Sequence, residues 1–275
     1  MVQKSSYPPR VARHLACASI LALALGIGGC QTSGLSDITG SIDEKADTAR
    51  ATDPRRDIEV YQERYRANPK DADAALKYGK ALRATGQRSQ AVAVLEQASI
   101  ANPGNKPLLA AYGRALADNG NFQEAFDVLG RAHSPDDPDW RLLSAQGATL
   151  DQLGRYEEAR QYYASALKIA PDHPSVLSNL GLSYVLSKDL AKAEETLRRA
   201  SRLAGNDQRV RANLALAVGL QGNFAEAEKI VKADLPPAEA AANVTQLKRL
   251  LARKDRENAR AEADKMPIAA AGRTD

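Results

Sequence analysis

Residues 176–200 read VLSNLGLSYVLSKDLAKAEETLRRA, and this stretch contains the pattern that decides the fold. Gly181 is followed twelve residues later by Ala193 and nineteen residues later by Ala200, with Leu197 between the two alanines. The glycine recurs at intervals of 34 residues, at Gly79, Gly113 and Gly147, and Ala215 continues the series. A fixed period of this length is the signature of a repeat architecture.

The other positions of the pattern recur with the same period. The first alanine is found at Ala91, Ala125, Ala159, Ala193 and Ala227. The second is found at Ala98, Ala132, Ala166 and Ala200, with Asp234 in the fifth copy. The large residue between them is Leu95, Leu129, Tyr163, Leu197 and Val231. A glycine marks a turn at Gly86, Gly120, Gly154 and Gly222, with Lys188 as the exception. Small residues let two helices approach closely, and the large residue fills the space between them.

This pattern resembles the tetratricopeptide repeat. The resemblance implies an all-α solenoid, in which helical hairpins stack to bury an apolar face that no single hairpin can bury alone. Five repeats are expected within residues 72–241, at residues 72–105, 106–139, 140–173, 174–207 and 208–241.

A helix is expected to cover each end of the stack, since an open solenoid end exposes apolar surface. Residues 54–71 are predicted to form the N-terminal cap, with Ile58, Tyr61 and Tyr65 at helical spacing. Residues 242–265 are predicted to form the C-terminal cap, which begins near residue 237. Its apolar face is expected to carry Ala241, Val244, Leu247, Leu250 and Leu251. Residues 266–275 are expected to be disordered.

The first 29 residues have the composition of a secretory signal peptide. Lys4, Arg10 and Arg13 precede an apolar run, 15–27, that is too short to span a bilayer. Ile27-Gly28-Gly29-Cys30 resembles the bacterial lipobox, which implies cleavage before Cys30 and attachment of acyl chains, such as palmitate, to that cysteine. The alternative is ordinary cleavage near Gly29, which leaves a free thiol.

The residues after the predicted cleavage site suggest where the protein is sorted and how it is tethered. Gln31, rather than aspartate, follows the cysteine, and in such lipoproteins this implies the outer membrane. Residues 30–53 are rich in Ser, Thr, Asp, Ala and Gly, which is typical of a flexible tether.

The charge balance argues against a nucleic-acid partner. The chain has 38 basic and 34 acidic residues, but three of the basic residues lie in the predicted signal, so the remainder carries a net charge of only +1. Such a balance gives no basic footprint for nucleic acid.

The sequence contains no pattern that indicates a catalytic, metal-binding or cofactor-binding site. Cys30 is the one cysteine outside the predicted signal, which excludes a disulfide within the mature chain and a cysteine-ligated metal site. His133 and His173 stand in turn-rich segments and are expected to be solvated. Because no nucleophile–base, phosphate-binding or paired-carboxylate motif is present, we expect a non-enzymatic protein without metal or cofactor.

The first helices of a tetratricopeptide solenoid line its concave side, where a protein partner binds. In this family the second, fifth, sixth, ninth and twelfth residues of each repeat face the groove. The candidate groove residues are therefore Leu76, Lys80, Arg83, Arg114, Arg141, Ser144, Asp151, Ser175, Asn179, Leu182, Arg209, Asn213 and Leu216.

Four residues of this side have specific candidate roles. Asn179 and Asn213 are 34 residues apart, and their amides either bind the backbone of an extended peptide or satisfy helix ends within the stack. Arg209 is a candidate for binding a carboxylate. Trp140 either anchors a partner or packs between repeats, and packing is the favoured interpretation.

Particular strings resemble a more specific family. DWRLLSAQGA at 139–148, SNLGLSY at 178–184 and GLQGNF at 219–224 resemble TadD, the tetratricopeptide lipoproteins of the tight-adherence (Flp-type) pilus machinery. The resemblance implies a pilotin-like lipoprotein on the periplasmic face of the outer membrane that helps the pilus secretin to assemble. The alternative is a scaffold for another envelope machine, such as outer-membrane protein assembly or cell-wall hydrolase recruitment.

Overall fold

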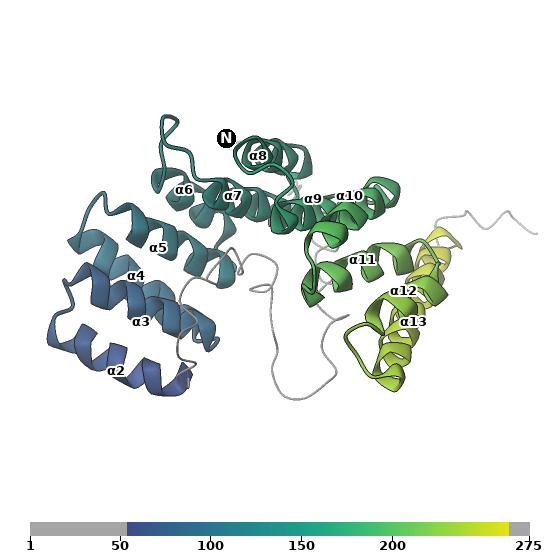
Figure 1. Cartoon of the computed structure of the whole chain (residues 1–275), viewed down its shortest axis with the longest axis horizontal. Coiled ribbons are helices and arrows are strands. Elements are labelled where there is room, and N and C mark those ends of the chain that lie inside the picture. The colour runs from purple at the N-terminus through teal and green to yellow at the C-terminus, as the bar shows by residue number, and fades with distance from the viewer. Residues whose placement is uncertain (1–53, 264–275) are drawn as a thin grey trace, which may run out of the picture.

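The computed structural model describes residues 54–263, which form twelve helices and no strand within that range. The predicted signal peptide, Cys30, the tether and the tail 266–275 lie outside the described residues. The helices follow an arch, with α2–α5 at one end and α11–α13 at the other (Figure 1). The predicted all-α solenoid is confirmed.

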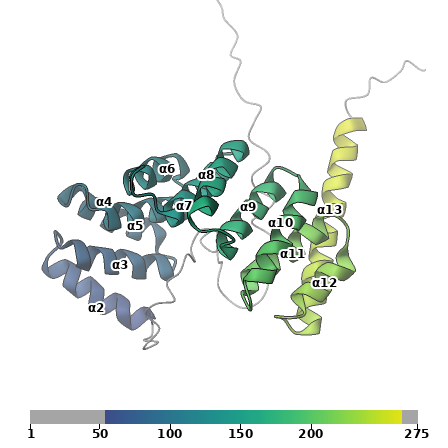
Figure 2. The ribbon, with the colours of Figure 1, turned by 45° about the horizontal axis from the view of Figure 1, so that its top comes forward.

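Ten of these helices form the five hairpins. The first helices of the hairpins are α3 (Ala72–Ala84), α5 (Lys106–Asp118), α7 (Trp140–Gln152), α9 (Pro174–Leu186) and α11 (Gln208–Leu220). The second helices are α4 (Arg88–Ala101), α6 (Phe122–Arg131), α8 (Tyr156–Ile169), α10 (Leu190–Leu203) and α12 (Phe224–Val231). The flanking helices are α2 (Pro54–Ala67) and α13 (Pro237–Ala263), and α13 runs well past α12 (Figure 2).

Glycine sets the closest contact inside each of the first four hairpins. A β-carbon on Gly181 would lie 2.4 Å from Leu197 Cγ, and one on Gly113 would lie 2.6 Å from Leu129 Cγ. Real β-carbons do not approach other atoms so closely, so a larger residue would force the facing leucine or its helix to shift. In the fifth hairpin Ala215 replaces this glycine, and α12 is only 8 residues long.

The N-terminus of almost every first helix is capped at the same place in the repeat. The side chains of Asp71, Asn105, Asp139 and Asp207 accept hydrogen bonds from the backbone N–H groups of the next helix. His173 takes this place in the fourth repeat and makes no such bond, but Pro174 opens that helix. An N-cap and a proline at the first helical position are two ways to begin a helix, because a cap side chain satisfies one of the free backbone donors and proline lacks such a donor.

The first helices lie on the inner side of the arch. Each first helix contacts the first helix of the next repeat, as in the pairs α3–α5, α5–α7, α7–α9 and α9–α11. The second helices lie on the outer side (Figure 1). The inner surface formed by the odd-numbered helices α3 to α11 is called the concave face below.

The C-terminal helix covers the last hairpin. Ala240 and Val244 are its most buried residues, and Leu247 lies against Gly219 of α11, where a β-carbon would be 2.6 Å away. Ala241, Leu250 and Leu251 of the predicted apolar face are half-buried. In the fifth repeat Asp234 pairs with Arg211, with 2.8 Å between Arg211 Nε and Asp234 Oδ2. An ion pair therefore stands where the other repeats bury alanine.

Candidate partner-binding face

The N-terminal half of the concave face carries three arginines from three successive first helices. Arg83 of α3 donates from Nε to Asp118 Oδ2 of α5 at 2.6 Å, and both side chains are largely buried. Arg141 of α7 lies 3.9 Å from Asp139 Oδ1 through its Nη1 atom. Arg114 lies between them on α5. We call these five residues, Arg83, Arg114, Asp118, Asp139 and Arg141, the arginine cluster.

Arg114 differs from the other two arginines of the cluster. It makes no hydrogen bond or ion pair with another residue of 54–263. Burial lowers the pKa of the Arg114 guanidinium, and the charges of Arg83 and Arg141 lower it further, whereas Asp139 and Asp118 oppose these effects. An arginine nevertheless stays charged in a protein, so Arg114 holds a partly desolvated cation with no anion bound directly to it.

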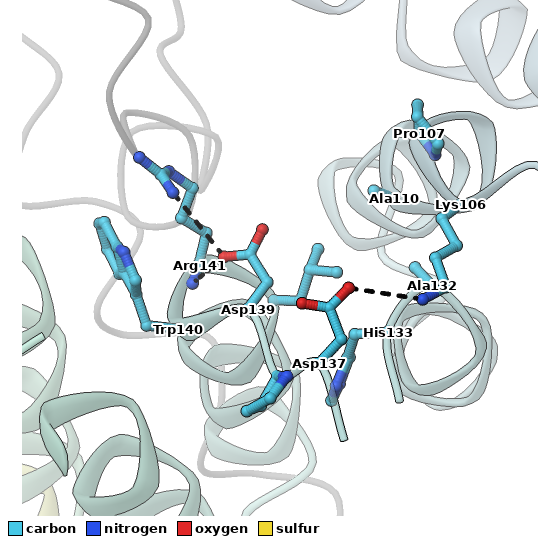
Figure 3. A pocket seen from close by; sticks show the side chains of 11 residues that line it. Lys106, Pro107, Ala110, Ala132, His133, Asp137, Asp139, Trp140 and Arg141 are labelled. Carbon is cyan, nitrogen blue, oxygen red and sulfur yellow. Dashed lines mark hydrogen bonds and ion pairs between the residues drawn. The ribbon is translucent and has the colours of Figure 1, made fainter. Parts of the chain in front are cut away.

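A cavity of about 390 Å³ adjoins the arginine cluster between the N-terminal ends of α5 and α7 (Figure 3). Its apolar wall comes from Pro107, Ala110, Pro138, Trp140 and Leu142. Its polar lining includes Lys106, His133, Asp137, Asp139 and Arg141. The cavity and the arginine cluster therefore share Asp139 and Arg141, and they form one continuous surface.

The cavity exists because α6 ends early. The helix stops at Arg131 after 10 residues, whereas α4, α8 and α10 each have 14. The segment that follows contains Pro135 and Pro138, and Asp137 N donates to Ser134 O in a tight turn. Proline disfavours the helical conformation of the residue before it, so the chain leaves the helix here and opens space beside α7.

Trp140 is fixed at the edge of this cavity. Its ring lies 4.0 Å from the ring of His173 between centroids, and the Arg141 guanidinium carbon lies 4.5 Å from the indole centroid. Trp140 is half-buried and packs against the core beside Leu143. It therefore packs between repeats and also presents part of its ring to the cavity.

The histidines differ from the sequence expectation, because neither is a solvated loop residue. His133 is half-buried, and its Nε2 lies 2.9 Å from Oε1 of the buried Gln146. His173 is half-buried under Trp140, and its Nδ1 lies 2.9 Å from Ser175 Oγ. Turn composition indicated exposure, but the aromatic neighbour and the buried amide come from other helices.

The C-terminal half of the concave face carries hydrogen bonds that link successive first helices. Asn179 Nδ2 donates to Ser144 Oγ at 3.1 Å, and Asn213 Nδ2 donates to Ser178 Oγ at 3.0 Å. Each bond connects residues 35 positions apart in the sequence. We call these two bonds the asparagine ladder, and they satisfy neither a helix end nor a peptide backbone.

Asp151 is the most buried charged group of this half. It accepts hydrogen bonds from Tyr163 OH at 2.8 Å and from Ser183 Oγ at 2.6 Å. Burial raises the pKa of Asp151 to about 6, although the bonds from Ser183 and Tyr163 and the charge of Arg160 lower it. The interaction joins α7, α8 and α9.

Several predicted groove residues are therefore not presented to a partner. Ser144, Asp151, Asn179 and Leu182 are buried, because the close contact between α7 and α9 encloses them. Leu76 is half-buried against the N-terminal core, and Ser175 bonds to His173. Arg209 Nη2 donates to Asp207 at 3.0 Å, so its charge is already paired. Leu216 is half-buried, and Lys80 is exposed.

No pattern in the sequence pointed directly to Asp118 or to the cavity. Asp118 stands at the thirteenth residue of its repeat, outside the positions taken to face the groove. Asp139 belongs to a pattern that does indicate its position, because Asp71, Asn105, Asp139 and Asp207 recur at intervals of 34 or 68 residues as an N-cap signal. Within 54–263 no three His, Cys, Asp or Glu side chains gather as metal ligands do, and no helix there is long and apolar enough to cross a membrane.

Comparison with known families agrees with this architecture. Tetratricopeptide-repeat profiles match residues 82–147 and 152–217, residues 129–174 and residues 208–231. Together these matches span residues 82–231, which is more than half of the chain. The chain belongs to the tetratricopeptide-repeat family. This family is generally a scaffold for protein–protein interaction.

Solved tetratricopeptide structures share the fold at low sequence identity. PilW, described as a widely conserved type IV pilus biogenesis factor, is 20% identical over 70% of this chain and 91% of its own, with a TM-score of 0.61. The pilF protein of Pseudomonas aeruginosa is 23% identical over 67% of this chain and 86% of its own, with a TM-score of 0.52.

A similar solenoid occurs in a protein of another kind, the Cut9–Hcn1 hetero-tetramer of APC/C. Its matching chain is 18% identical over 74% of this chain, with a TM-score of 0.60, and this chain spans 40% of that chain's length. A search of curated proteins returned no match. At these identities the likeness concerns the fold.

Proposed function

We propose that this chain is a non-enzymatic, pilotin-like lipoprotein of the TadD type, which holds a secretin subunit at the outer membrane while the pilus secretin assembles. The observation that carries this proposal is the combination of a lipobox cysteine, Cys30, with a tetratricopeptide concave face on the same chain. The cysteine supplies a membrane anchor, and the concave face supplies the binding surface.

The anchor requires acyl chains on Cys30. Each buried CH₂ group contributes about 0.8 kcal/mol to membrane binding, so two or three chains give stable attachment. The 23 residues between Cys30 and Pro54 reach at most about 80 Å when extended. The concave face therefore works within that distance of the membrane surface, where a tethered site raises the effective concentration of a bound partner.

The family resemblance and the structural neighbours support the same role. The strings at 139–148, 178–184 and 219–224 resemble TadD, and one neighbour of the fold, PilW, is described as a type IV pilus biogenesis factor. The binding contribution comes from a surface that combines arginines, an aromatic edge and an open cavity. Such a mixture is typical of protein recognition sites.

The test is complementation of a strain that lacks the gene. Secretin multimers in outer-membrane fractions are quantified after expression of wild type, Cys30→Ala or Cys17→Ala, the last being a matched change of the other cysteine. We expect multimers with wild type and Cys17→Ala, and a loss with Cys30→Ala. Normal multimers in the strain without the protein would show the pilotin role to be wrong, and crosslinking from the concave face would then identify another envelope partner.

A further inference from the structure

The C-terminal helix α13 continues beyond the part that closes the stack. It has 27 residues, whereas the helices of the five hairpins have between 8 and 14. Its first half packs on the last hairpin through Ala240, Val244 and Leu247. After the half-buried Leu251, every side chain that the structure describes in this helix is exposed, and the helix projects past α12 (Figure 2). The projecting part therefore buries no side chain in the stack.

The outer side of α13 carries four exposed arginines in a line. We call them the arginine row, and they are Arg249, Arg253, Arg256 and Arg260. Spacings of four, three and four residues place them within about 60° of one another around the helix axis, along about 16 Å of its length. The same geometry places the residues that pack on the last hairpin on the opposite side of the helix. The arginine row therefore faces away from the stack.

The charge around the arginine row is positive, and the chain pairs little of it. Residues 248–260 carry six basic and two acidic residues, whereas the whole chain after the predicted signal has a net charge of only +1. Arg253 Nε lies 3.7 Å from Glu257 Oε1, and both side chains are exposed. Among the side chains that the structure describes within 54–263, none forms an ion pair with Arg249, Arg256 or Arg260.

Basic residues on the outer helices of the hairpins differ from this row, because acidic neighbours pair them closely. On α10, Lys192 Nζ lies 2.8 Å from Asp189 Oδ2, and Arg198 Nη2 lies 2.5 Å from Glu226 Oε1. On α8, the corresponding pair is Arg155 with Glu158 at 2.6 Å. The positive charge of the arginine row is therefore the larger resource for an anionic ligand outside the concave face.

The shape of the row indicates which anionic ligand it suits. Four guanidinium groups in a line on an exposed helix can all meet a flat surface of phosphates at once, and each guanidinium can bind a phosphate through two parallel hydrogen bonds. Groups of about four to eight basic residues on a helix are typical of binding to anionic lipid headgroups. Residues 252–261 contain no large apolar residue, so the contact depends on charge rather than on insertion into the hydrocarbon.

We propose that the arginine row of α13 binds the anionic phospholipid headgroups of a membrane surface. Helices α2, which follows the predicted tether, and α13 stand at opposite ends of the arch (Figure 1). A lipid anchor at one end and an electrostatic contact at the other together orient the arch on the membrane. The anchor also raises the effective concentration of the row at the surface, so a contact that is weak by itself is sufficient.

The inference goes beyond the proposed function, because neither the concave face nor a secretin takes part in it. It rests only on the chain being held near a membrane. The test therefore omits the acyl chains. It uses residues 30–275, the chain that remains after the predicted cleavage, with Cys30→Ser.

Cosedimentation with vesicles measures the binding. Vesicles of equal parts phosphatidylglycerol and phosphatidylcholine are compared with vesicles of phosphatidylcholine alone. At about 50 mM salt we expect at least about tenfold stronger binding to the anionic vesicles, and a loss of most of this binding at about 500 mM salt. Equal binding to the two kinds of vesicle would overturn the proposal.

Two fourfold variants separate the arginine row from the general charge of the chain. Replacing all four arginines of the row by glutamine should weaken binding to the anionic vesicles by at least about tenfold. A matched variant loses the same charge from exposed sites on α2 and α10 and should weaken binding by at most about threefold; its changes are Arg64→Gln, Arg66→Gln, Arg199→Gln and Arg202→Gln. Equal losses would overturn the proposal. Circular dichroism confirms that both variants are folded.

Duplex DNA, added at the same phosphate concentration as the anionic vesicles, tests whether the row is a general polyanion site. The vesicles should bind more tightly, and equal or tighter binding of DNA would overturn the proposal. Vesicle binding, together with normal secretin multimers in the strain without the protein, would show only the pilotin role to be wrong. Absent vesicle binding, together with multimers that depend on Cys30, would show only this inference to be wrong.

Discussion

At the ninth residue of the repeat, the first two repeats carry Lys80 and Arg114, whereas the last two carry Leu182 and Leu216. At the sixth residue, the last two repeats carry Asn179 and Asn213 instead of Lys77 and Ala111. The C-terminal half of the concave face therefore uses its polar side chains on each other, in the asparagine ladder. Within residues 54–263, the N-terminal half keeps one guanidinium, that of Arg114, without a directly bonded anion and beside an open cavity.

The position of a residue in the repeat therefore does not determine whether it stabilises the stack or binds a partner. The period brings corresponding residues of successive first helices side by side. Whether they serve stacking or binding then depends on their partners, because a polar group that is bonded within the stack has little left to offer a ligand. Stability should therefore respond to changes in the C-terminal half, and binding to changes in the N-terminal half.

The largest expected effect is common to both halves, because the helix contact at the glycines is the same. Gly113→Ala and Gly181→Ala should each lower the free energy of unfolding by about 3 kcal/mol, since the new methyl group meets a leucine at 2.6 or 2.4 Å. Urea denaturation measures both. Clearly unequal losses would show that the two halves do not share one scaffold.

A double variant provides the control for this prediction. Adding Leu197→Ala to Gly181→Ala removes the atoms that the new methyl group meets. The double variant should be more stable than the sum of the two single effects predicts, because neighbouring changes of this kind are not additive. Simple addition would mean that the methyl group acts elsewhere.

The second effect is a pH dependence specific to the C-terminal half. The pKa of Asp151 is raised from 3.8 to about 6 in the folded chain. Between these values the folded chain holds a proton that the unfolded chain has released, so the free energy of unfolding falls as the pH rises. Above about 6 this contribution is constant, and the total loss is on the order of 3 kcal/mol.

The Asp151→Asn variant isolates this contribution. The part of the fall between pH 3.8 and about 6 that Asp151 causes should be absent from its stability curve, while other carboxylates continue to act. The measurement is urea denaturation of both proteins from pH 3.5 to 8. Parallel curves would refute the assignment of a raised pKa to Asp151.

The third effect tests the asparagine ladder. Asn179→Ala should lower the free energy of unfolding by about 1 to 2 kcal/mol, because it removes the bond to the fully buried Ser144 and leaves a small void. Asn213→Ala should cost less, since Asn213 is only half-buried. Urea denaturation measures both variants. An unchanged stability of Asn179→Ala would show that the asparagine ladder does not support the stack.

The smallest expected effect on stability belongs to Arg114→Ala. Its guanidinium has no bonded partner in the described chain, so the free energy of unfolding should change by less than about 0.5 kcal/mol. Thermal denaturation followed by circular dichroism is sufficient to measure it. A large destabilisation would show that Arg114 supports the stack, and the contrast between the two halves would then disappear.

The repeat positions could be read from the sequence because they follow from local rules. Two helices that cross closely need small residues at the crossing, such as Gly181 and Ala193, and a large one beside it, such as Leu197. The same requirement recurs in every hairpin, which produces the 34-residue period. The binding face was harder to predict. Asp151 and Asn179 were assigned to the groove from their places in the repeat, yet the contact between α7 and α9 buries them.

The helical hairpins, their number and their turns could be predicted from the residues alone, since they depend on neighbours within one or two repeats. The pairing of polar groups across the stack, and so the choice of groups that remain for a partner, depends on how the repeats pack. Within residues 54–263, Arg114 has no directly bonded anion because Asp118 bonds to Arg83 of another helix, and the cavity opens because α6 ends before Pro135. Both outcomes depend on contacts between three successive repeats, and a local pattern of residues does not determine such contacts.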